Sequence, residues 1–335
     1  MEYNFYSHQD SVGHDLTRLP PEECRDFCDS EPSAIAYNTL GYIKTSIAPP
    51  DQWITTNWNQ PDSEGFYIKK EYDPVQKAID RIVDYQGEKL PITFTITTCK
   101  RLNYFIRAMN TFLVRCQDAH LFQEWICVDD NSTPEDREKM RARFPFFKFI
   151  MKTPAEKGHA KSMNMILDTV HTDFILHYED DWFVHTNFSV AALMIWLQGQ
   201  SYTQLILRKI DRQNNNIVGN LGAPVHLYTA NFHHYIKPSI NRKLDELYNI
   251  SPPVEDTRKD WWWPGLSLNP SIIKINELKQ HVGHFNEAII PELFEYEYAL
   301  RYYMKGMESA YINLPIHHIG ETSSYVLNGE FRSHD

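Results

Sequence analysis

The sequence predicts an α/β fold with a mainly parallel sheet, preceded by a small α+β region. From residue 89 onward, short apolar stretches rich in β-branched residues alternate with helical patterns, as in sheets joined by crossover helices. Several of these stretches end in charged residues, at the edge where open α/β sheets bind ligands. Residues 1–88 are instead rich in Pro, Asp, Asn and Tyr. We therefore expect an N-terminal region at 1–88 and a larger domain at 89–335.

The composition argues against several classes of protein. The 335 residues carry a net charge of −11 without any basic run, so a nucleic-acid partner is not expected. The N-terminus lacks a leader pattern, and the most apolar window, 188–197, is too short to cross a bilayer. The five cysteines are odd in number and lack paired metal spacing, which favours free thiols in a reducing compartment. The sequence thus predicts a cytoplasmic protein without signal peptide or transmembrane segment.

The N-terminal region is expected to contain short elements. Residues 21–28 begin with proline and acids, which predicts a short helix with Cys24 and Cys28 on one face. Residues 34–44 are typical of two short strands interrupted by Asn and Gly. Residues 71–90 predict a connecting helix, because apolar side chains recur at helical spacing. These side chains are Val75, Ile79, Ile82 and Val83.

Three pieces of this region resemble a PAN/apple module, namely 10–16, 23–28 and 36–44. The resemblance covers about residues 3–70 and implies binding of a protein or a carbohydrate. The cysteines that would pair with Cys24 and Cys28 are missing, since Ala34 and the pair Gly41-Tyr42 lie where they would be expected. A module held by disulfides is therefore not expected. The alternative is a packing or oligomerisation extension of the main domain.

The first strand of the main domain ends in candidate ligand-binding residues. The β-branched stretch 92–99 includes Thr97, and Lys100 and Arg101 follow it directly. An amphipathic helix is expected from Asn103 to about residue 116. Arg101 is thereby placed at the carboxyl end of a strand, where a ligand is expected.

The second strand, at 125–128, runs directly into Asp129 and Asp130. Thr133 can cap the next helix, with proline at its first position. A capping turn alone needs fewer acids. Asp129 and Asp130 are therefore candidates to accept hydrogen bonds from a nucleotide's base or ribose, at the same sheet edge as Arg101.

A third strand at 146–150 is followed by a helix that opens near Lys157 and Gly158. Glycine permits close approach of the backbone, and a lysine near a helix N-terminus favours phosphate. The fourth strand, at 174–178, ends in the consecutive acids Glu179, Asp180 and Asp181. Three adjacent carboxylates repel one another, so a cation is expected there, with Mg²⁺ or Mn²⁺ suited to oxygen ligands. A solvated acidic turn is the alternative.

In order and spacing, these pieces resemble glycosyltransferases of the A-type (nucleotide-diphospho-sugar transferase) fold, closest to family 2, over residues 91 to about 320. The resemblance implies a nucleotide-sugar donor, with UDP as the expected nucleotide, and places Asp130 near the base and ribose. It also implies that Asp181, with Glu179, holds Mn²⁺ or Mg²⁺ on the diphosphate. The expected donor-binding residues are Thr97, Arg101, Asp129, Asp130, Lys157, Gly158 and Asp180.

The second half carries further family features. Residues 261–270, with three consecutive tryptophans, match the family's glycine-containing segment beside the donor sugar, which implies roles for Trp262, Trp263 and Gly265. A core position is the alternative for any single tryptophan. Segment 314–320 matches the region where many such enzymes supply a metal-binding histidine. The sequence leaves His317 and His318 equally placed for that role.

The catalytic base is expected on the helix at 291–305. The family spacing, counted back from Gly306 through Arg301, selects Glu295. The sequence departs from the family pattern, because Phe294 replaces the first acid and the second is Glu rather than Asp. Glu297 therefore stays a rival.

The resulting hypothesis is a metal-dependent, inverting glycosyltransferase acting on a hydroxyl of a glycan or glycoprotein acceptor. One alternative is a nucleotidyltransferase, which ordinarily has a glycine-rich loop after the first strand, whereas residues 98–101 contain no glycine. The other is a non-catalytic carbohydrate-binding protein, which the intact acids argue against.

Overall fold

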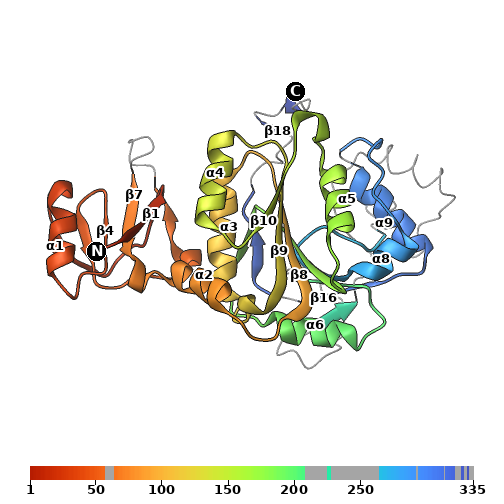
Figure 1. The fold of residues 1–335 in the computed structure, drawn as a ribbon, viewed down its shortest axis with the longest axis horizontal. Helices are drawn as coiled ribbons and strands as arrows, with labels where there is room; N and C mark the ends of the chain where they lie inside the picture. Colours follow the sequence, from red (N-terminus) through yellow and green to blue (C-terminus); the bar gives the residue numbers. More distant parts are fainter. Residues whose placement is uncertain are drawn as a thin grey trace, which may run out of the picture.

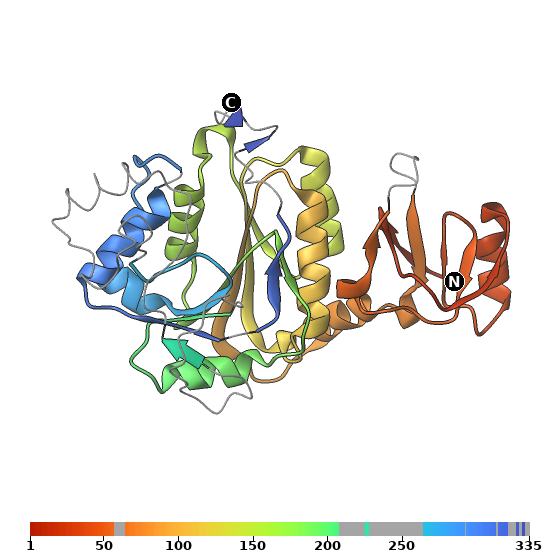
Figure 2. The ribbon, with the colours of Figure 1, turned by 180° about the vertical axis from the view of Figure 1, so that it is seen from behind.

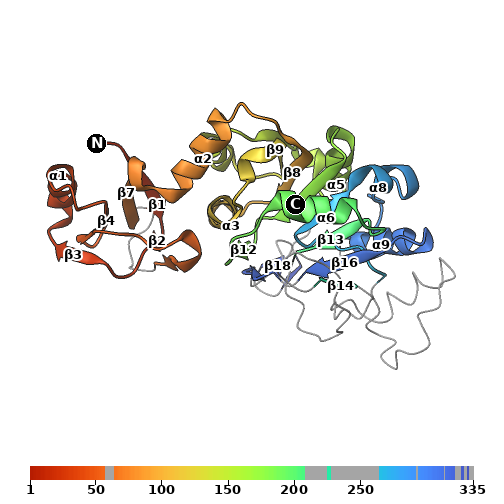
Figure 3. The same ribbon diagram turned by 90° about the horizontal axis from the view of Figure 1, so that it is seen from below.

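The computed structural model describes residues 1–56, 64–207, 264–291, 293–312 and 314–320, and the backbone of 225–227, 326–327 and 330–331. Within these residues, a lobe with a small sheet lies beside a larger lobe built on an eight-stranded sheet (Figure 1). Helix α2 (Pro74–Asp84) runs between the two lobes (Figure 3).

The central sheet has the strand order β10-β9-β8-β11-β15-β13-β16-β14. Neighbours from β10 to β11 are parallel, β15 is antiparallel to both β11 and β13, and β13 and β16 are parallel. The predicted α/β fold with a mainly parallel sheet is therefore confirmed. In sheet order the strands are Lys148–Met151, Phe122–Asp129, Leu90–Thr98, Phe174–Glu179, Ser271–Lys274, Gln204–Ile206, Ser309–Ile312 and Val225–Leu227.

Helices cover both faces of this sheet, with α3 and α4 on one face and α5, α8 and α9 on the other (Figures 1 and 2). Each layer buries its own apolar core. Because side chains alternate along a strand, Trp125 of β9 packs into the first core and Ile126 into the second. The helices of this lobe are α3 Leu102–Arg115, α4 Pro134–Arg143, α5 His159–Thr169, α6 Val190–Gln198, α8 Ile275–His281 and α9 Phe294–Met304.

The N-terminal lobe contains a five-stranded sheet with the order β1-β7-β4-β5-β3. The helix predicted at 21–28 is divided into a 3-10 turn, Pro21–Glu23, and α1, Cys24–Ser30. Cys24 and Cys28 are free thiols on the buried face of α1, which confirms that they share one helix face. The strands, in sheet order, are Tyr3–Ser7, Gly65–Lys69, Ala36–Asn38, Tyr42–Lys44 and Asp15–Arg18.

The connecting helix is shorter than predicted. It begins at Pro74 because the Asp73 carboxylate accepts hydrogen bonds from the backbone of Val75 and Gln76, and it ends at Asp84. Val83 is 52% exposed and lies off the buried face. The first core continues from the helices of the large lobe through α2 to side chains of the N-terminal lobe. These are Tyr6, Ala36, Trp53, Phe66 and Ile68.

Shorter elements complete the described chain. Strand β12 (Trp182–Val184) pairs antiparallel with β17 (Ile316–His318), which brings residues far apart in the sequence side by side. No helix in the described ranges is long and apolar enough to span a bilayer. The remaining strands are β2 Gln9–Asp10, β6 Ile54–Thr55, β18 Val326–Leu327 and β19 Glu330–Phe331, and the remaining 3-10 turns are Pro50–Gln52, Lys70–Tyr72, Ala119–Leu121 and Pro154–Glu156.

Candidate active site

The acids Glu179, Asp180 and Asp181 lie at the carboxyl end of β11, as predicted. Parallel pairing places Glu179 opposite Thr97, so the acids meet the end of β8. Asp180 is fully buried, and its Oδ2 accepts a hydrogen bond of 2.6 Å from Thr98 Oγ1. The cluster is thus held between the two central strands rather than exposed on a turn.

Arg101 neutralises much of this acidic cluster. Its guanidinium forms an ion pair with Asp180, and Nη1 donates to Asp181 Oδ2 over 2.9 Å. Burial, which outweighs Arg101, raises the pKa of Asp180 to about 6. Burial would also raise the pKa of Asp181, but hydrogen bonds and charges from His318 and Arg101 lower it below its usual value. Arg101 thus supplies one positive charge beside these acids, and the Mg²⁺ or Mn²⁺ expected there stays a prediction.

The pairing of β12 with β17 distinguishes the two candidate histidines. His318 lies opposite Trp182, and its Nε2 is 3.2 Å from Asp181 Oδ2. The ring of His317 lies instead against His185, with ring centres 4.8 Å apart. Of the two, His318 is the one beside the acids.

The pair Asp181 and His318 fits part of a metal site. Asp181 Oδ1 is buried and has no hydrogen-bond partner among the described residues. A Cβ atom at Gly320 would come within 2.6 Å of Asp181 Oδ2, so any larger residue would crowd that oxygen. No cluster of three or more His, Cys, Asp or Glu arranged for a metal occurs in the described ranges. The chain thus offers two ligands here, and bound phosphate or water oxygens would complete the coordination.

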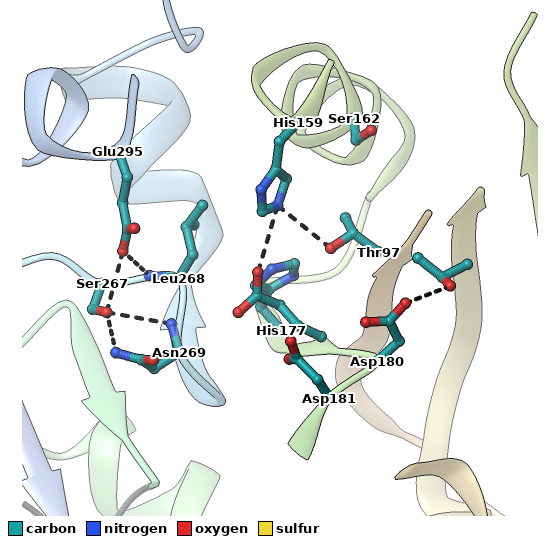
Figure 4. Close-up of polar contacts among 12 residues, drawn as sticks. Thr97, His159, Ser162, His177, Asp180, Asp181, Ser267, Leu268, Asn269 and Glu295 are labelled. Carbon is teal, nitrogen blue, oxygen red and sulfur yellow. Dashed lines mark hydrogen bonds and ion pairs between the residues drawn. The ribbon is translucent and has the colours of Figure 1, made fainter. Parts of the chain in front are cut away.

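Glu179 makes different contacts from Asp181. Its Oε1 is 3.8 Å from His159 Nε2, and its Oε2 accepts a hydrogen bond of 3.4 Å from Trp182 Nε1. His159 also contacts Thr97 Oγ1 over 3.4 Å (Figure 4). Burial lowers the pKa of His159 to about 4, so the ring is neutral near pH 7. Burial, with the charges of Asp181 and Glu295, raises the pKa of Glu179 well above its usual value.

The two acids after β9 have different surroundings. Asp129 is fully buried, and its Oδ2 accepts hydrogen bonds from Arg137 Nε at 2.6 Å and from the backbone of Ser132. The N–H of Asp130 donates to the carbonyl oxygen of Thr98 over 2.8 Å. Asp129 thus holds the loop together, and Asp130 joins the loop to the end of β8.

The segment before α5 also separates two lysines. Lys157 is exposed, whereas the nearby Lys152 is buried and pairs with Asp130 over 3.1 Å. Gly158 has φ +118°, a conformation that side-chain-bearing residues rarely adopt, and its N–H donates to Asp130 Oδ2 over 2.8 Å. The backbone of Gly158 therefore contacts Asp130, and its predicted role at a phosphate stays a prediction.

Glu295 lies in the first turn of α9 and faces the segment after Gly265. Its Oε1 accepts hydrogen bonds from Leu268 N at 2.7 Å and Ser267 Oγ at 3.2 Å (Figure 4). Gly265 has φ +113°, which favours glycine at this turn. Trp262 and Trp263 lie outside the described residues.

Glu297 is fixed by a partner on its own helix. Arg301, one turn later, donates to both carboxylate oxygens, with Nε to Oε1 at 2.8 Å and Nη2 to Oε2 at 3.0 Å. Arg301 also donates to the carbonyl oxygens of Val282 and His284. Through Arg301, Glu297 helps to hold the loop that precedes α9, and its side chain is 1% exposed. Glu295, in contrast, is partly exposed.

Sequence reasoning missed several side chains of the site. Lys152 follows an edge strand and has no motif around it, so only its burial reveals it. Thr98 was passed over because the strand pattern marks it as an ordinary β-branched residue. His159 directly follows the candidates Lys157 and Gly158, so its position at the start of α5 is an available signal.

No protein-family model matches the chain. The putative glycosyltransferase R655 of Acanthamoeba polyphaga mimivirus is 33% identical over 80 residues, which are 23% of this chain and 25% of that protein. The chain thus matches about a quarter of the length of this curated relative.

Three solved structures share features of overall shape at low identity. TarS residues 1–349 of S. aureus has 13% identity and a TM-score of 0.41, covering 67% of this chain and 60% of its own. GalNAc-T7 with UDP, GalNAc and Mn²⁺ has 12% identity and a TM-score of 0.48, and the match covers 97% of this chain and 56% of that one. The mannosyltransferase PcManGT of Pyrobaculum calidifontis, with GDP-Man and Mn²⁺, has 14% identity and a TM-score of 0.41. The match covers 73% of this chain and 63% of that one.

Proposed function

We propose that the protein is a glycosyltransferase of the A-type fold that moves a sugar from a nucleoside diphosphate sugar to an acceptor hydroxyl. The observation that carries the proposal is the meeting of Arg101, Asp181 and His318 at the carboxyl edge of the parallel strands. Thr98 links this group to Asp130, since it bonds to both Asp180 and Asp130. The 80-residue similarity to a putative glycosyltransferase supports the same activity.

The donor would lie along this edge, with its base toward Asp130 and its diphosphate toward Arg101 and Asp181. UDP is the proposed nucleotide. Arg101 can donate to phosphate oxygens in the geometry it now uses for carboxylates. Thr97 and Gly158 border the same space, whereas Asp129 and Asp180 act by holding the loop and the arginine.

Asp181 and His318 would hold a divalent cation, Mn²⁺ or Mg²⁺. Such an ion, when bound, neutralises charge on the departing diphosphate. Glu179, in contact with His159 and Trp182, would shape the pocket beside them.

Glu295 is the proposed base, and the mechanism would be inverting. Its carboxylate is a cause of the raised pKa of Glu179, so the two groups lie close enough to interact. From there Glu295 would take the proton from the acceptor hydroxyl as that oxygen attacks the anomeric carbon. Glu297 is committed to Arg301 and is not available for this step.

Residues 1–88 would form a module that contacts the acceptor, which we propose to be a glycan or glycoprotein. A protein starting near Glu88 would then hydrolyse the donor but transfer poorly to its acceptor. Loss of folding on this truncation would instead favour a packing role, consistent with the core that continues through α2.

The direct test is a thermal-shift screen of the full chain against nucleotide sugars, with Mn²⁺, with Mg²⁺ and with chelator. A donor that binds the native state raises the melting temperature by mass action. We expect the largest rise with a UDP-sugar and metal, followed by release of the nucleoside diphosphate. Absence of a shift with every nucleotide sugar would contradict the proposal, and release of pyrophosphate from a nucleoside triphosphate would indicate a nucleotidyltransferase.

A further inference from the structure

Lys152 is a charged side chain with no contact to solvent. It follows β10, and its Nζ donates to Gly158 O at 2.7 Å and to Ser162 Oγ at 2.9 Å, and lies 3.1 Å from Asp130 Oδ2. An ammonium has three donors, and all three are used. Burying a charge is unfavourable unless it is paired and hydrogen-bonded, so this amine has a specific set of acceptors rather than a generic surface partner.

The same contacts fix one oxygen of Asp130 and leave the other without a partner. Asp130 Oδ2 accepts from Gly158 N at 2.8 Å and faces Lys152 Nζ. Asp130 Oδ1 is buried and has no hydrogen-bond partner in the described part of the chain. Leaving a buried acceptor without a partner is unfavourable, and a donor group on a ligand would offset that cost.

The backbone of Lys152 is held as firmly as its side chain. Its N–H donates to Asp129 O over 3.1 Å, and its carbonyl accepts from Arg137 Nη2 over 2.6 Å. Arg137 in turn binds the carboxylate of Asp129. Lys152 therefore holds the loop after β9 and the start of α5 in a fixed position relative to each other.

We propose that Lys152 is a positioning residue that holds Asp130 so that its free oxygen selects donors whose base carries a ring N–H. Uracil and guanine present such a donor, whereas the corresponding ring nitrogens of cytosine and adenine are acceptors and repel a carboxylate. The inference rests on the proposed function, in which Asp130 faces the base. It adds that base preference depends on a side chain that does not touch the nucleotide.

The test measures dissociation constants of UDP, GDP, CDP and ADP by calorimetry with Mn²⁺ present, using the full chain and four variants. Lys152→Met removes the charge but keeps most of the side-chain stem. The matched control is Lys148→Met, at an exposed lysine of β10, the strand that Lys152 follows. We define the preference as the dissociation constant of CDP or ADP divided by that of UDP or GDP. We expect this ratio to fall at least tenfold in Lys152→Met. Lys148→Met should keep the wild-type preference. A folded Lys152→Met protein with unchanged preference would overturn the inference, as would equal weakening of all four nucleotides.

Lys152→Met leaves the Asp130 carboxylate buried without its cation, so this variant could unfold. The double variant Lys152→Met/Asp130→Asn removes both charges and avoids that cost. If Lys152 acts through Asp130, the double variant should show the preference of Asp130→Asn alone. A further loss of preference in the double variant would overturn the inference. A wild-type protein that binds no nucleotide would refute the proposed function as well, whereas retained preference in both lysine variants would refute this inference only.

Discussion

Glu295 Oε1 accepts a hydrogen bond of 2.7 Å from the backbone N–H of Leu268. This contact joins the first turn of α9 to the segment that precedes β15, across 27 residues of sequence. One carboxylate oxygen is thereby held in place while the side chain stays partly exposed. Glu297, two residues later, is buried and bound at both oxygens by Arg301. The two acids of this helix thus have separate tasks, which leads to the first prediction.

We expect Glu295→Gln to bind donor and metal normally but to lose transfer by at least about a hundredfold, because glutamine cannot accept the acceptor's proton. Its amide oxygen can still accept from Leu268, so the fold should be kept. Initial rates and donor affinity, measured on the same preparation, check this. Normal transfer by Glu295→Gln would remove Glu295 as the base.

We expect Glu297→Gln to lower the free energy of unfolding by about 1–3 kcal/mol, because Arg301 loses a charged partner in a buried pair. Transfer per folded molecule should stay close to wild type. Urea denaturation followed by activity below the midpoint separates the two effects. A hundredfold loss of transfer at full stability would move the base to Glu297.

The histidines of β17 make a matched pair for the metal site. We expect His318→Ala to raise the Mn²⁺ concentration needed for donor binding at least about tenfold. The His318 ring contacts Asp181, and loss of a metal ligand or of a group that orients one weakens metal binding by about this factor. His317→Ala, whose ring contacts His185, should behave as wild type. Calorimetric titration of Mn²⁺ with UDP present measures the difference, and equal effects of both changes would argue against the assignment.

Asp181→Ala should abolish the Mn²⁺-dependent part of donor binding. The apo protein should keep its stability within about 1 kcal/mol, because reduced repulsion within the acidic cluster offsets the lost contacts of Asp181 with Arg101 and His318. Melting temperatures with and without metal and UDP report both quantities. An unchanged metal-dependent shift in this variant would contradict the site.

Asp73 connects the lobes, since its carboxylate caps α2 and accepts hydrogen bonds from Asn4 and the hydroxyl of Tyr6. We expect Asp73→Ala to lower the free energy of unfolding by about 2–4 kcal/mol through loss of the cap and of these bonds. The exposed Asp80→Ala on the same helix is the control and should change it by less than about 0.5 kcal/mol. Chemical denaturation checks this, and equal values for both variants would mean that the cap contributes little.

Cys28 gives a pH-dependent prediction. Burial raises the pKa of its thiol to about 12, so the folded state keeps the proton when the unfolded state, with a pKa of about 8.5, has lost it. Between these values the unfolded state binds fewer protons, and stability falls with rising pH by up to about 1.4 kcal/mol per unit for this group. Cys28→Ala should therefore flatten the decline above pH 9, whereas Ser30→Ala on the exposed face of α1 should not. Parallel pH curves for wild type and Cys28→Ala, from urea titrations, would contradict this.

Several strands and the helix start after Thr133 could be predicted because their signals are local. The β-branched run before Thr98 and the cap at Thr133 act within a few residues, and both are found where expected. Polar residues at strand ends are also brought to one edge by any parallel sheet, which is why Arg101, Asp130 and Asp181 could be grouped in advance. Element ends were less accurate, as the early end of α2 at Asp84 shows, because the packing of following residues decides them.

The sequence by itself determined the α/β class, the edge that carries the site and the short set of acids, arginine and histidines from which it is built. The tertiary structure decided where the members of each set lie: His318 rather than His317 beside Asp181, Glu295 apart from Glu297, and Lys152 rather than Lys157 beside Asp130. The physical reason is that neighbouring residues share composition but not environment. Their roles depend on strand register and burial, and these are fixed by contacts between segments tens to more than a hundred residues apart.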